Sequence, residues 1–269
     1  MNIGFLGAGN MGGAILRGYI ASKDGKANDD ENIFVFGVNR DKLSLTCSET
    51  GANPCYEIED LVEKCDIIFL GVKPNIFDEI LPVVAKKINS SKVIVSMAAG
   101  ISISYIKKHL GRNVKVVRIM PNTPARVGLG MTSISTEDII EDGYMSVIKK
   151  ILSGIGVYKL VDESQIHNVI GVSGSSPAYT YLYIDALIES AKKNGMTETD
   201  AKLFAVQAVK GAAQMVLDSE DTPSELAEKV CSKGGTTIEA VNVLKENDFK
   251  ELVEKAYQAA VDKSKKLEK

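Results

Sequence analysis

The stretch Gly7-Ala8-Gly9-Asn10-Met11-Gly12 decides the fold of this 269-residue chain. It follows a short apolar run, Ile3–Leu6, and leads into helical apolar spacing over Met11–Ile20. A G-x-G-x-x-G sequence between a strand and a helix predicts a dinucleotide-binding turn. Its first glycine allows the turn, the second admits a pyrophosphate to the backbone, and the third lets the helix pack on the strand. We expect Leu6 and all six residues of the turn to contact the cofactor, through N–H groups at the helix start. A purely structural glycine turn is the alternative.

Strands and helices alternate through the rest of the first half. Strands are predicted at Ile33–Val38, Asp66–Val72, Lys92–Met97 and Val114–Met120, and helices at Asp60–Lys64, Pro74–Lys87 and Ile103–Leu110. Near-continuous Val, Ile and Leu runs separated by helices are typical of a parallel sheet covered on both faces. We predict an α/β fold whose N-terminal domain, residues 1–160, is a Rossmann-like, doubly wound sheet.

The second half has a different pattern. After about Asp162 the strand-like runs end and Ala-rich helical spacing takes over. Pro177 suits the first turn of a helix capped by Ser176, and Thr197 with Asp200 resembles the cap of the next helix. Further helices are expected to begin at Pro223, at Thr236 or Thr237, and at Asp248. Residues 161–269 are therefore predicted to form an all-α domain.

Composition argues against several classes of protein. The 32 basic and 35 acidic residues give a net charge of −3, which does not support nucleic-acid binding. Two histidines and four cysteines without a C-x-x-C pair are a poor basis for a metal site or a His-based hydrolase. We expect reduced thiols in a cytoplasmic protein. No targeting signal and no apolar run of the ~18–20 residues that a membrane span needs is visible, so no membrane association is expected.

The end of the second predicted strand, Gly37-Val38-Asn39-Arg40, bears on the choice of cofactor. An NAD-specific site usually has Asp or Glu there for the ribose 2′-hydroxyl. An amide and a guanidinium at Asn39 and Arg40 suit a 2′-phosphate, so NADPH is favoured and NADH is the second candidate. The polar insert at residues 22–32 accounts for the long spacing from Gly12. Asp41 would restore a carboxylate after a shift of one residue, and Arg40 as a plain surface residue is the other alternative.

Three later loops follow strand ends, at the edge where open α/β sheets place ligands. From these loops we expect cofactor contacts by Val72, Lys73, Pro74, Met97, Ala98, Ala99 and Asn122. Lys73 would face the cofactor, the small residues would pack on the nicotinamide, and Asn122 would bind its carboxamide. Each loop also has an ordinary interpretation as a solvated lysine, a tight turn or an Asn-Thr-Pro turn.

The segment Cys231-Ser232-Lys233-Gly234-Gly235-Thr236-Thr237 precedes a predicted helix. Two glycines and two hydroxyl residues at a helix start present N–H groups and the positive end of the helix dipole to a small anion such as a carboxylate. A flexible connection with a threonine cap is an equal alternative. Cys231 is expected to be a packing residue because no histidine motif accompanies it, and His109 and His167 are expected to be structural.

Taken together, these motifs resemble the pyrroline-5-carboxylate reductase family nearly from end to end. The resemblance rests on G-F-L-G-A-G-N-M-G at Gly4–Gly12, F-L-G-V-K-P at Phe69–Pro74, S-M-A-A-G at Ser96–Gly100, R-I-M-P-N-T-P at Arg118–Pro124, S-G-S-S-P-A-Y at Ser173–Tyr179 and S-K-G-G-T-T at Ser232–Thr237. The last two motifs are the most specific. Lys233 departs from the proline that many members have, and members vary most at Asn39-Arg40.

The resemblance implies that NAD(P)H reduces the C=N bond of 1-pyrroline-5-carboxylate to give L-proline, the last step of proline biosynthesis. It implies a substrate site formed by Glu163, Glu220, Ser232, Gly234, Gly235, Thr236 and Thr237. In that site the Ser232–Thr237 segment holds the carboxylate, and Thr237 is the catalytic residue, whose hydroxyl hydrogen-bonds the ring nitrogen. Glu163 and Glu220 border the substrate, although solvated carboxylates at helix ends are the alternative.

The resemblance also implies self-association. The family pattern is a domain-intertwined dimer, in which the helical domain of one subunit completes the site over the other subunit's cofactor, and such dimers can assemble further. The helical domain is then both substrate-binding and dimerising. The Ala-rich helices from Ser176 to Ala213 agree with this, since they carry more small and apolar surface than one small domain buries.

Two alternatives stay open. One is another NADP-dependent imine or β-hydroxyacid reductase, although Ser173–Tyr183 lacks the lysine or histidine general acid of the hydroxyacid enzymes. The other is a non-catalytic NADP-binding sensor, which would bind the cofactor without turnover.

Overall fold

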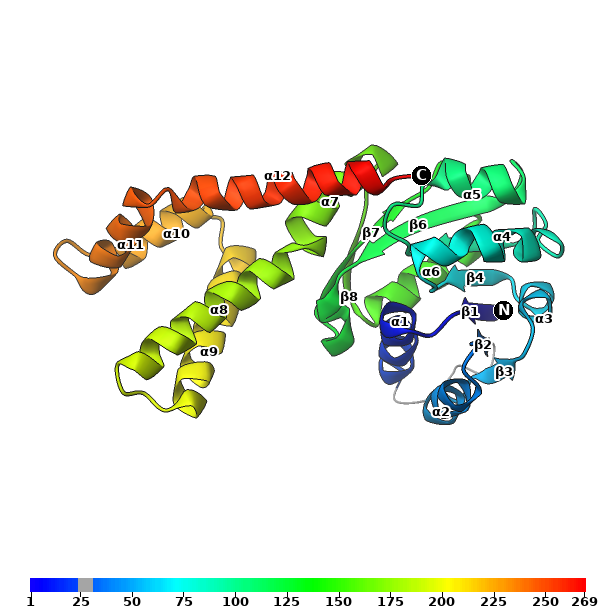
Figure 1. Ribbon diagram of the computed structural model, residues 1–269, viewed down its shortest axis with the longest axis horizontal. Coiled ribbons are helices and arrows are strands. Elements are labelled where there is room, and N and C mark those ends of the chain that lie inside the picture. The colour runs from blue at the N-terminus through cyan, green and yellow to red at the C-terminus, as the bar shows by residue number, and fades with distance from the viewer. Residues whose placement is uncertain (24–30) are drawn as a thin grey trace. The chain divides into compact units, whose positions relative to one another are not determined.

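The structure is a computed structural model that describes residues 1–23 and 31–269. It contains two compact units, Met1–Gly174 together with Ala260–Lys269, and Ser175–Ala259 (Figure 1). Most of the expected polar insert at residues 22–32 lies outside the described residues. The predicted change of character near residue 160 falls at the end of the last strand, whereas the division into compact units falls after Gly174.

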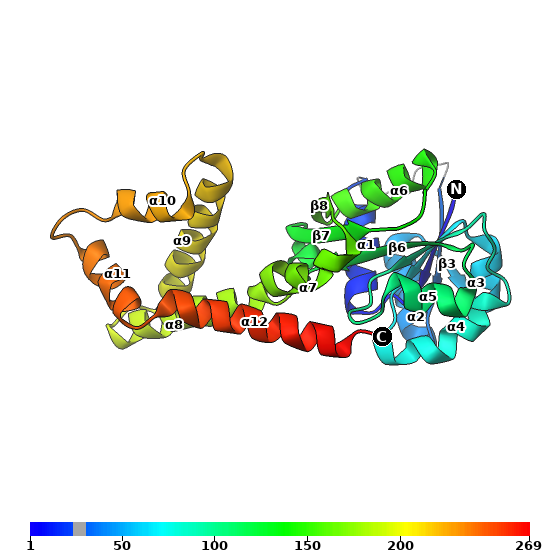
Figure 2. The ribbon, with the colours of Figure 1, turned by 90° about the horizontal axis from the view of Figure 1, so that it is seen from above.

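Within the described residues, one sheet of eight strands forms the centre of the first unit (Figure 2). Its strand order is β3-β2-β1-β4-β5-β6-β7-β8. The strands are β1 (Asn2–Leu6), β2 (Asn32–Phe36), β3 (Asn53–Cys55), β4 (Ile67–Leu70), β5 (Val93–Ser96), β6 (Lys115–Pro121), β7 (Gly130–Ser135) and β8 (Gly156–Leu160). The chain moves outward from β1 to β3, returns to the centre at β4 and then moves outward on the other side. This order confirms the predicted doubly wound sheet.

The sheet departs from the predicted parallel arrangement at one place. All neighbouring strands are parallel except β6 and β7, which pair antiparallel. Only the short 3-10 turn η2 (Thr123–Val127) joins these two strands. A parallel crossover needs a dozen residues or more, so the chain can only turn back.

Helices cover both faces of the sheet. The first unit contains α1 (Asn10–Ala21), α2 (Arg40–Thr50), α3 (Ile58–Lys64), α4 (Phe77–Ala85), α5 (Ile103–Leu110), α6 (Asp142–Ser153) and α7 (Ile166–Val169), with the short elements η1 (Pro74–Ile76), η3 (Glu163–Gln165) and η4 (Ile170–Gly174). Helices α1, α2 and α6 share one buried cluster, which includes Leu16 and Ile148. Helices α3, α4 and α5 share the other cluster, which includes Leu61 and Phe77. The sheet is therefore buried on both sides, as its apolar strands predict.

The chain after β8 is helical. Its long helices are α8 (Ser176–Lys193), α9 (Glu198–Asp218), α10 (Pro223–Val230), α11 (Thr236–Glu246) and α12 (Phe249–Leu267). The predicted cap at Thr197 is confirmed, because its hydroxyl accepts from the Asp200 N–H at 3.2 Å. Helix α8 begins one residue earlier than expected, with Ser175 as its N-cap and a proline still in its first turn.

The next observations concern the state of the thiols, membrane-spanning helices and metal sites. All four cysteines are free, and burial raises the pKa of Cys65 to about 12, so that its thiol stays protonated at neutral pH. Over residues 1–23 and 31–269, no helix is long and apolar enough to cross a bilayer. In the same residues, no three His, Cys, Asp or Glu side chains are grouped so that they could hold a metal ion.

The turn after β1 is packed against the loop after β4. Gly7 has a φ of +95°, and a Cβ atom there would lie 2.9 Å from Val72. A Cβ atom on Gly12 or on Gly71 would lie less than 3.0 Å from the Gly7 carbonyl oxygen. The third glycine of the motif thus allows helix and strand to approach, as predicted. Gly71 is equally necessary for this close approach, although it was not singled out from the sequence.

This packing gives a first prediction. Gly71→Ala should lower the free energy of unfolding by about 1–3 kcal/mol, because the added methyl group overpacks a backbone contact. Thermal unfolding measures this as a fall in Tm of roughly 2–4 °C per kcal/mol. Gly143→Ala is the control, since a Cβ there meets nothing within 4 Å. Equal Tm values for the two variants would contradict the account.

Candidate active site

The start of α1 is open to a ligand. Gly9 is the N-cap of this 12-residue helix, no side chain caps it, and the first turn has no acidic residue. A Cβ atom added to Gly9 would meet nothing within 4 Å, in contrast to Gly7 and Gly12. The first N–H groups of a helix have no partner within the helix, and the helix dipole makes this end positive. The residues present therefore fit a dinucleotide diphosphate.

A groove of about 770 Å³ extends from this turn along α1. Three cationic side chains from different elements line it: Arg17 of α1, Lys42 of α2 and Arg126 of η2. Arg17 is paired with Glu49 at 2.8 Å. The excess of positive charge favours an anionic ligand at the mouth of the groove. None of these three residues was predicted, because none lies in a recognisable motif.

The end of β2 carries the predicted ribose-phosphate residues. Asn39 is the N-cap of α2 and accepts from the Lys42 N–H at 2.9 Å, which leaves its amide NH₂ group to donate. The Arg40 guanidinium lies 4.7 Å above the ring of Tyr56 and donates to the Tyr56 carbonyl at 3.3 Å. Both Arg40 and Tyr56 line a pocket of about 440 Å³ beside Val38. Tyr56 is thus a candidate site residue that the sequence motifs did not indicate.

The competing residue Asp41 lies in the first turn of α2. Its negative charge complements the helix dipole there. The helix supplies a structural reason for this carboxylate, whereas Arg40 faces the pocket.

The three predicted loops lie at the same sheet edge as the glycine turn, because they follow the adjacent parallel strands β4, β5 and β6. After β4, Lys73 is exposed and precedes η1, which begins at Pro74. After β5, Ala98 is buried, and Met97 and Ala99 are more accessible. This is the edge at which doubly wound sheets bind ligands, next to the β1–β4 switch point.

Asn122, expected to bind the nicotinamide carboxamide, is largely used within the protein. Its Oδ1 accepts from the Met131 N–H at 2.8 Å, and its Nδ2 donates to the Ser173 carbonyl at 3.0 Å. The side chain is buried and joins the β6 end to η4. One Nδ2 hydrogen is left for a ligand.

In the second unit, the start of α11 also has open donors. Gly235 is its N-cap without a side-chain cap, and Thr236 and Thr237 form its first turn. Gly234 has a φ of +72°, and a Cβ atom on Gly235 would collide with the Ser232 hydroxyl. The turn therefore favours glycine at position 234, and it presents N–H groups and hydroxyls at one helix end, as an anion site requires.

The two predicted glutamates have different surroundings. Glu163 begins η3 in the first unit, and its Oε1 accepts from Arg118 at 2.7 Å and from the Ile103 N–H at 2.9 Å. Glu220 is exposed between α9 and α10 in the second unit. Glu163 thus serves a buried ion pair, which the sequence did not indicate.

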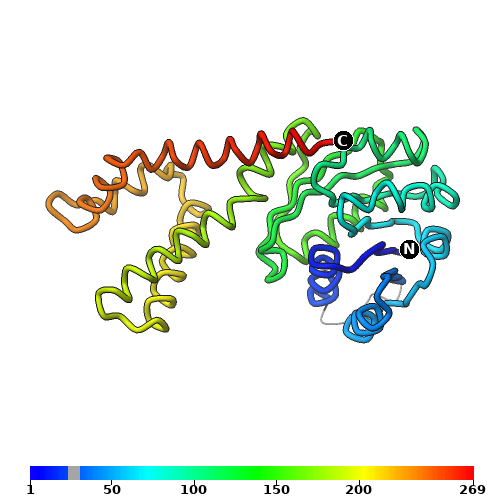
Figure 3. Tube along the Cα trace, viewed as in Figure 1, coloured from blue at the N-terminus to red at the C-terminus, as the bar shows by residue number. Residues whose placement is uncertain are grey.

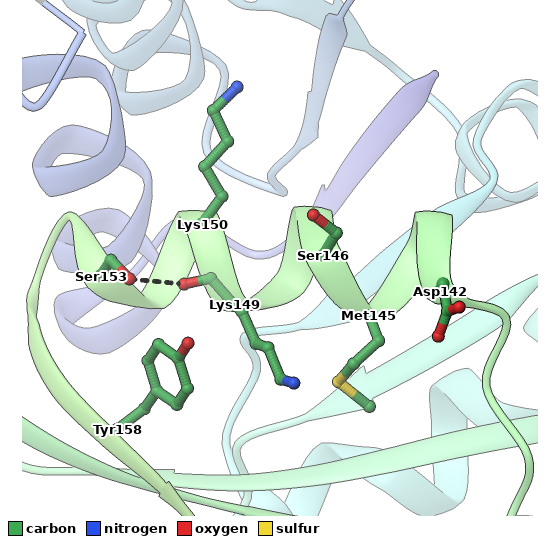
Figure 4. A pocket seen from close by; sticks show the side chains of 7 residues that line it. All are labelled: Asp142, Met145, Ser146, Lys149, Lys150, Ser153 and Tyr158. Carbon is green, nitrogen blue, oxygen red and sulfur yellow. Dashed lines mark hydrogen bonds between the residues drawn. The ribbon is translucent and has the colours of Figure 1, made fainter.

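A separate pocket of about 490 Å³ lies beside α6 (Figure 4). Its lining comes from α6 and from Tyr158 of β8, and the Ser153 hydroxyl donates to the Lys149 carbonyl at 3.0 Å. None of the predicted site residues lines it. We therefore place the candidate site at the glycine turn and not here.

Family models match one segment in each half of the chain. Residues 163–267 match the family model described as pyrroline-5-carboxylate reductase dimerisation. Residues 2–100 match the model described as NADP oxidoreductase, coenzyme F420-dependent.

Full-length relatives agree with these matches. The pyrroline-5-carboxylate reductase of Escherichia coli is 40% identical over 267 residues, which cover 99% of this chain and 98% of the relative. The solved structure of a Coxiella burnetii pyrroline-5-carboxylate reductase has a TM-score of 0.89 at 33% identity, over 100% of this chain and 98% of that chain. A Plasmodium falciparum pyrroline carboxylate reductase solved with NADP bound has a TM-score of 0.88 at 29% identity, with the same coverage.

The open space at Gly9 gives the second prediction. Gly9→Ala should keep the wild-type Tm, since the methyl group meets no protein atom, but it should occupy the space of the diphosphate. We expect the dissociation constant for NADPH, measured by its fluorescence, to rise by about ten-fold or more, equivalent to at least ~1.4 kcal/mol. Wild-type affinity in this variant would show that the diphosphate binds elsewhere.

Proposed function

The chain belongs to the pyrroline-5-carboxylate reductase family, and we propose that it reduces 1-pyrroline-5-carboxylate to L-proline with NADPH. The observation that carries this proposal is the 40% identity to the Escherichia coli enzyme over almost the whole of both chains. The open helix starts of α1 and α11 support it, because the reaction needs one site for a diphosphate and one for a carboxylate.

The cofactor site lies in the first unit. We propose that the N–H groups of Asn10–Gly12 hold the diphosphate, that Arg40 and Asn39 bind the 2′-phosphate, and that the loops at Val72–Pro74 and Met97–Ala99 receive the nicotinamide end. The solved relative with NADP bound supports the choice of NADPH. An arginine fork stacked on Tyr56 is suited to a phosphate group. When bound, the cofactor supplies a hydride.

The substrate site uses the second unit. The hydride goes to the imine carbon, and the ring nitrogen gains one proton, so the residues need to hold an anion and favour the protonated imine. We propose that the backbone and hydroxyls of Ser232–Thr237 hold the carboxylate and that the Thr237 hydroxyl hydrogen-bonds the ring nitrogen. Glu220 and the Oε2 atom of Glu163 would border this site and stabilise the positive charge of the iminium.

We also propose that the protein is a domain-intertwined dimer in the cytoplasm. The match of residues 163–267 to a dimerisation model supports the dimer. In the second unit, large apolar side chains such as Leu182, Phe204 and Leu217 are more than half exposed. An apolar surface of this extent is typical of a protein interface. The four free cysteines support a reducing compartment.

A direct assay tests the proposed function. Purified protein should oxidise NADPH when 1-pyrroline-5-carboxylate is added, with one L-proline formed per NADPH consumed, and it should be slower with NADH. Binding of NADPH without turnover would instead favour a cofactor sensor. Turnover restricted to other imines or to β-hydroxyacids would assign a different reductase.

The role of Thr237 gives a separate prediction. Thr237→Val should lower kcat by about 100-fold, the lower end of the effect of a positioned proton donor, and should leave the NADPH dissociation constant unchanged. Thr237→Ser keeps the hydroxyl and should restore most of the rate. If the serine variant were as slow as the valine variant, the hydroxyl would not be the group that matters.

A further inference from the structure

The last residues of the chain bind the loop of residues 97–102, which follows β5 in the first unit. The Lys269 N–H donates to the Gly100 carbonyl at 2.8 Å, and the Lys269 carbonyl accepts from the Ser102 hydroxyl at 2.7 Å. The Lys269 ammonium pairs with Asp78 of α4 at 2.8 Å. Figures 1 and 3 show this end of the chain beside α5. We name residues 267–269 the C-terminal segment.

A buried arginine anchors this segment. Arg118 of β6 is 1% exposed, and its Nη1 donates to Glu268 at 2.8 Å and to Glu163 at 2.7 Å. His167 of α7 is 3.1 Å from the other oxygen of Glu268, and it also hydrogen-bonds Ser264 of α12 at 2.9 Å. A charged group inside a protein needs such partners, since an unpaired one is costly. Glu268 is therefore held in one place from two sides.

The same network reaches the far end of the loop. Glu163, the second partner of Arg118, also accepts from the Ile103 N–H, the first N–H of α5, at 2.9 Å. The loop from Met97 to Ser102 thus has its end fixed through Glu163 and its middle fixed by backbone bonds to Lys269. Arg118 connects the two attachments.

The fit between loop and segment is close. Gly100 has a φ of +76°, and a Cβ atom there would lie 2.6 Å from the Leu267 carbonyl oxygen. Any side chain at position 100 would push the C-terminal segment away. Gly100 belongs to the S-M-A-A-G motif, so this glycine has a packing role in addition to its turn conformation.

We propose that Glu268 and the Lys269 backbone are positioning residues for cofactor binding: the C-terminal segment holds the Met97–Ser102 loop in the form that receives the nicotinamide. This inference rests on the proposed function, which assigns Met97, Ala98 and Ala99 to the cofactor site. The segment touches the loop on its Gly100–Ser102 side, so it acts through the backbone and leaves Ala99 free to meet a ligand.

Two variants with matched controls test the proposal. Glu268→Gln removes the anion that binds Arg118 and His167 while keeping the side-chain shape. Its control is Glu137→Gln, because Glu137 is exposed and lines the same surface pocket as Glu268 but takes no part in the ion pairs of Arg118. Gly100→Ala displaces the segment directly. Its control is Gly51→Ala, which has a similar φ of +70° with nothing within 4 Å of its Cβ.

The readouts are NADPH affinity, backbone hydrogen exchange over residues 97–103, and steady-state kinetics. We expect both test variants to raise the dissociation constant and the KM for NADPH about ten-fold and to speed exchange in the loop. The KM for the pyrroline substrate should change less than two-fold, and both controls should behave as wild type.

Several outcomes would overturn the proposal. If Glu268→Gln speeds exchange in the loop but binds NADPH like the wild type, the segment does not position the cofactor loop. Unchanged exchange would mean that Glu268 does not hold the segment. Failure of the wild type to reduce 1-pyrroline-5-carboxylate would refute the proposed function, while the affinity and exchange measurements would still decide this proposal.

Discussion

The structure depends on one close backbone contact, in which the carbonyl group of Gly7 packs against Gly12 and Gly71. The Gly7 oxygen lies so close to Gly12 and Gly71 that neither position has room for a Cβ atom. This contact fixes the start of α1 against both β1 and the loop after β4. It places the positive end of the helix at the sheet edge, where the loops after β4, β5 and β6 also lie. The proposed diphosphate site rests on this backbone packing and involves no charged side chain.

The chain uses its few arginines for distinct tasks. The Arg40 guanidinium lies over the ring of Tyr56 at the edge of a pocket. Arg17 and Arg126 line the groove beside α1, and Arg118 is buried between two carboxylates. In the proposed sites, helix N–H groups hold the diphosphate and the carboxylate, and Arg40 is the cationic side chain for the 2′-phosphate. Such a design suits a reaction in which the cofactor brings the hydride and the protein has to hold an anion and support one proton. It explains how a chain with only two histidines can serve a redox reaction.

Local sequence patterns allowed the central fold to be predicted. Contacts between residues that lie far apart in the sequence could not be predicted. The β1–α1 turn and the buried strands have strong apolar runs and glycines in sequence. In contrast, α2 is mostly polar, and β8 is an edge strand with little burial. Neither segment has the apolar periodicity from which a helix or strand can be predicted. Arg118 and Glu268 are 150 residues apart. The partners of Asn122 likewise depend on how strands and turns come together, which no local motif encodes.

The most direct test of this account is a crystal structure of the protein with NADPH bound. The account predicts that the diphosphate lies against the N–H groups of Asn10, Met11 and Gly12, in the space next to Gly9, with the 2′-phosphate on the Arg40 side chain. A diphosphate bound away from the start of α1, with the glycine turn unoccupied, would contradict the central claim that the glycine packing exists to build this site.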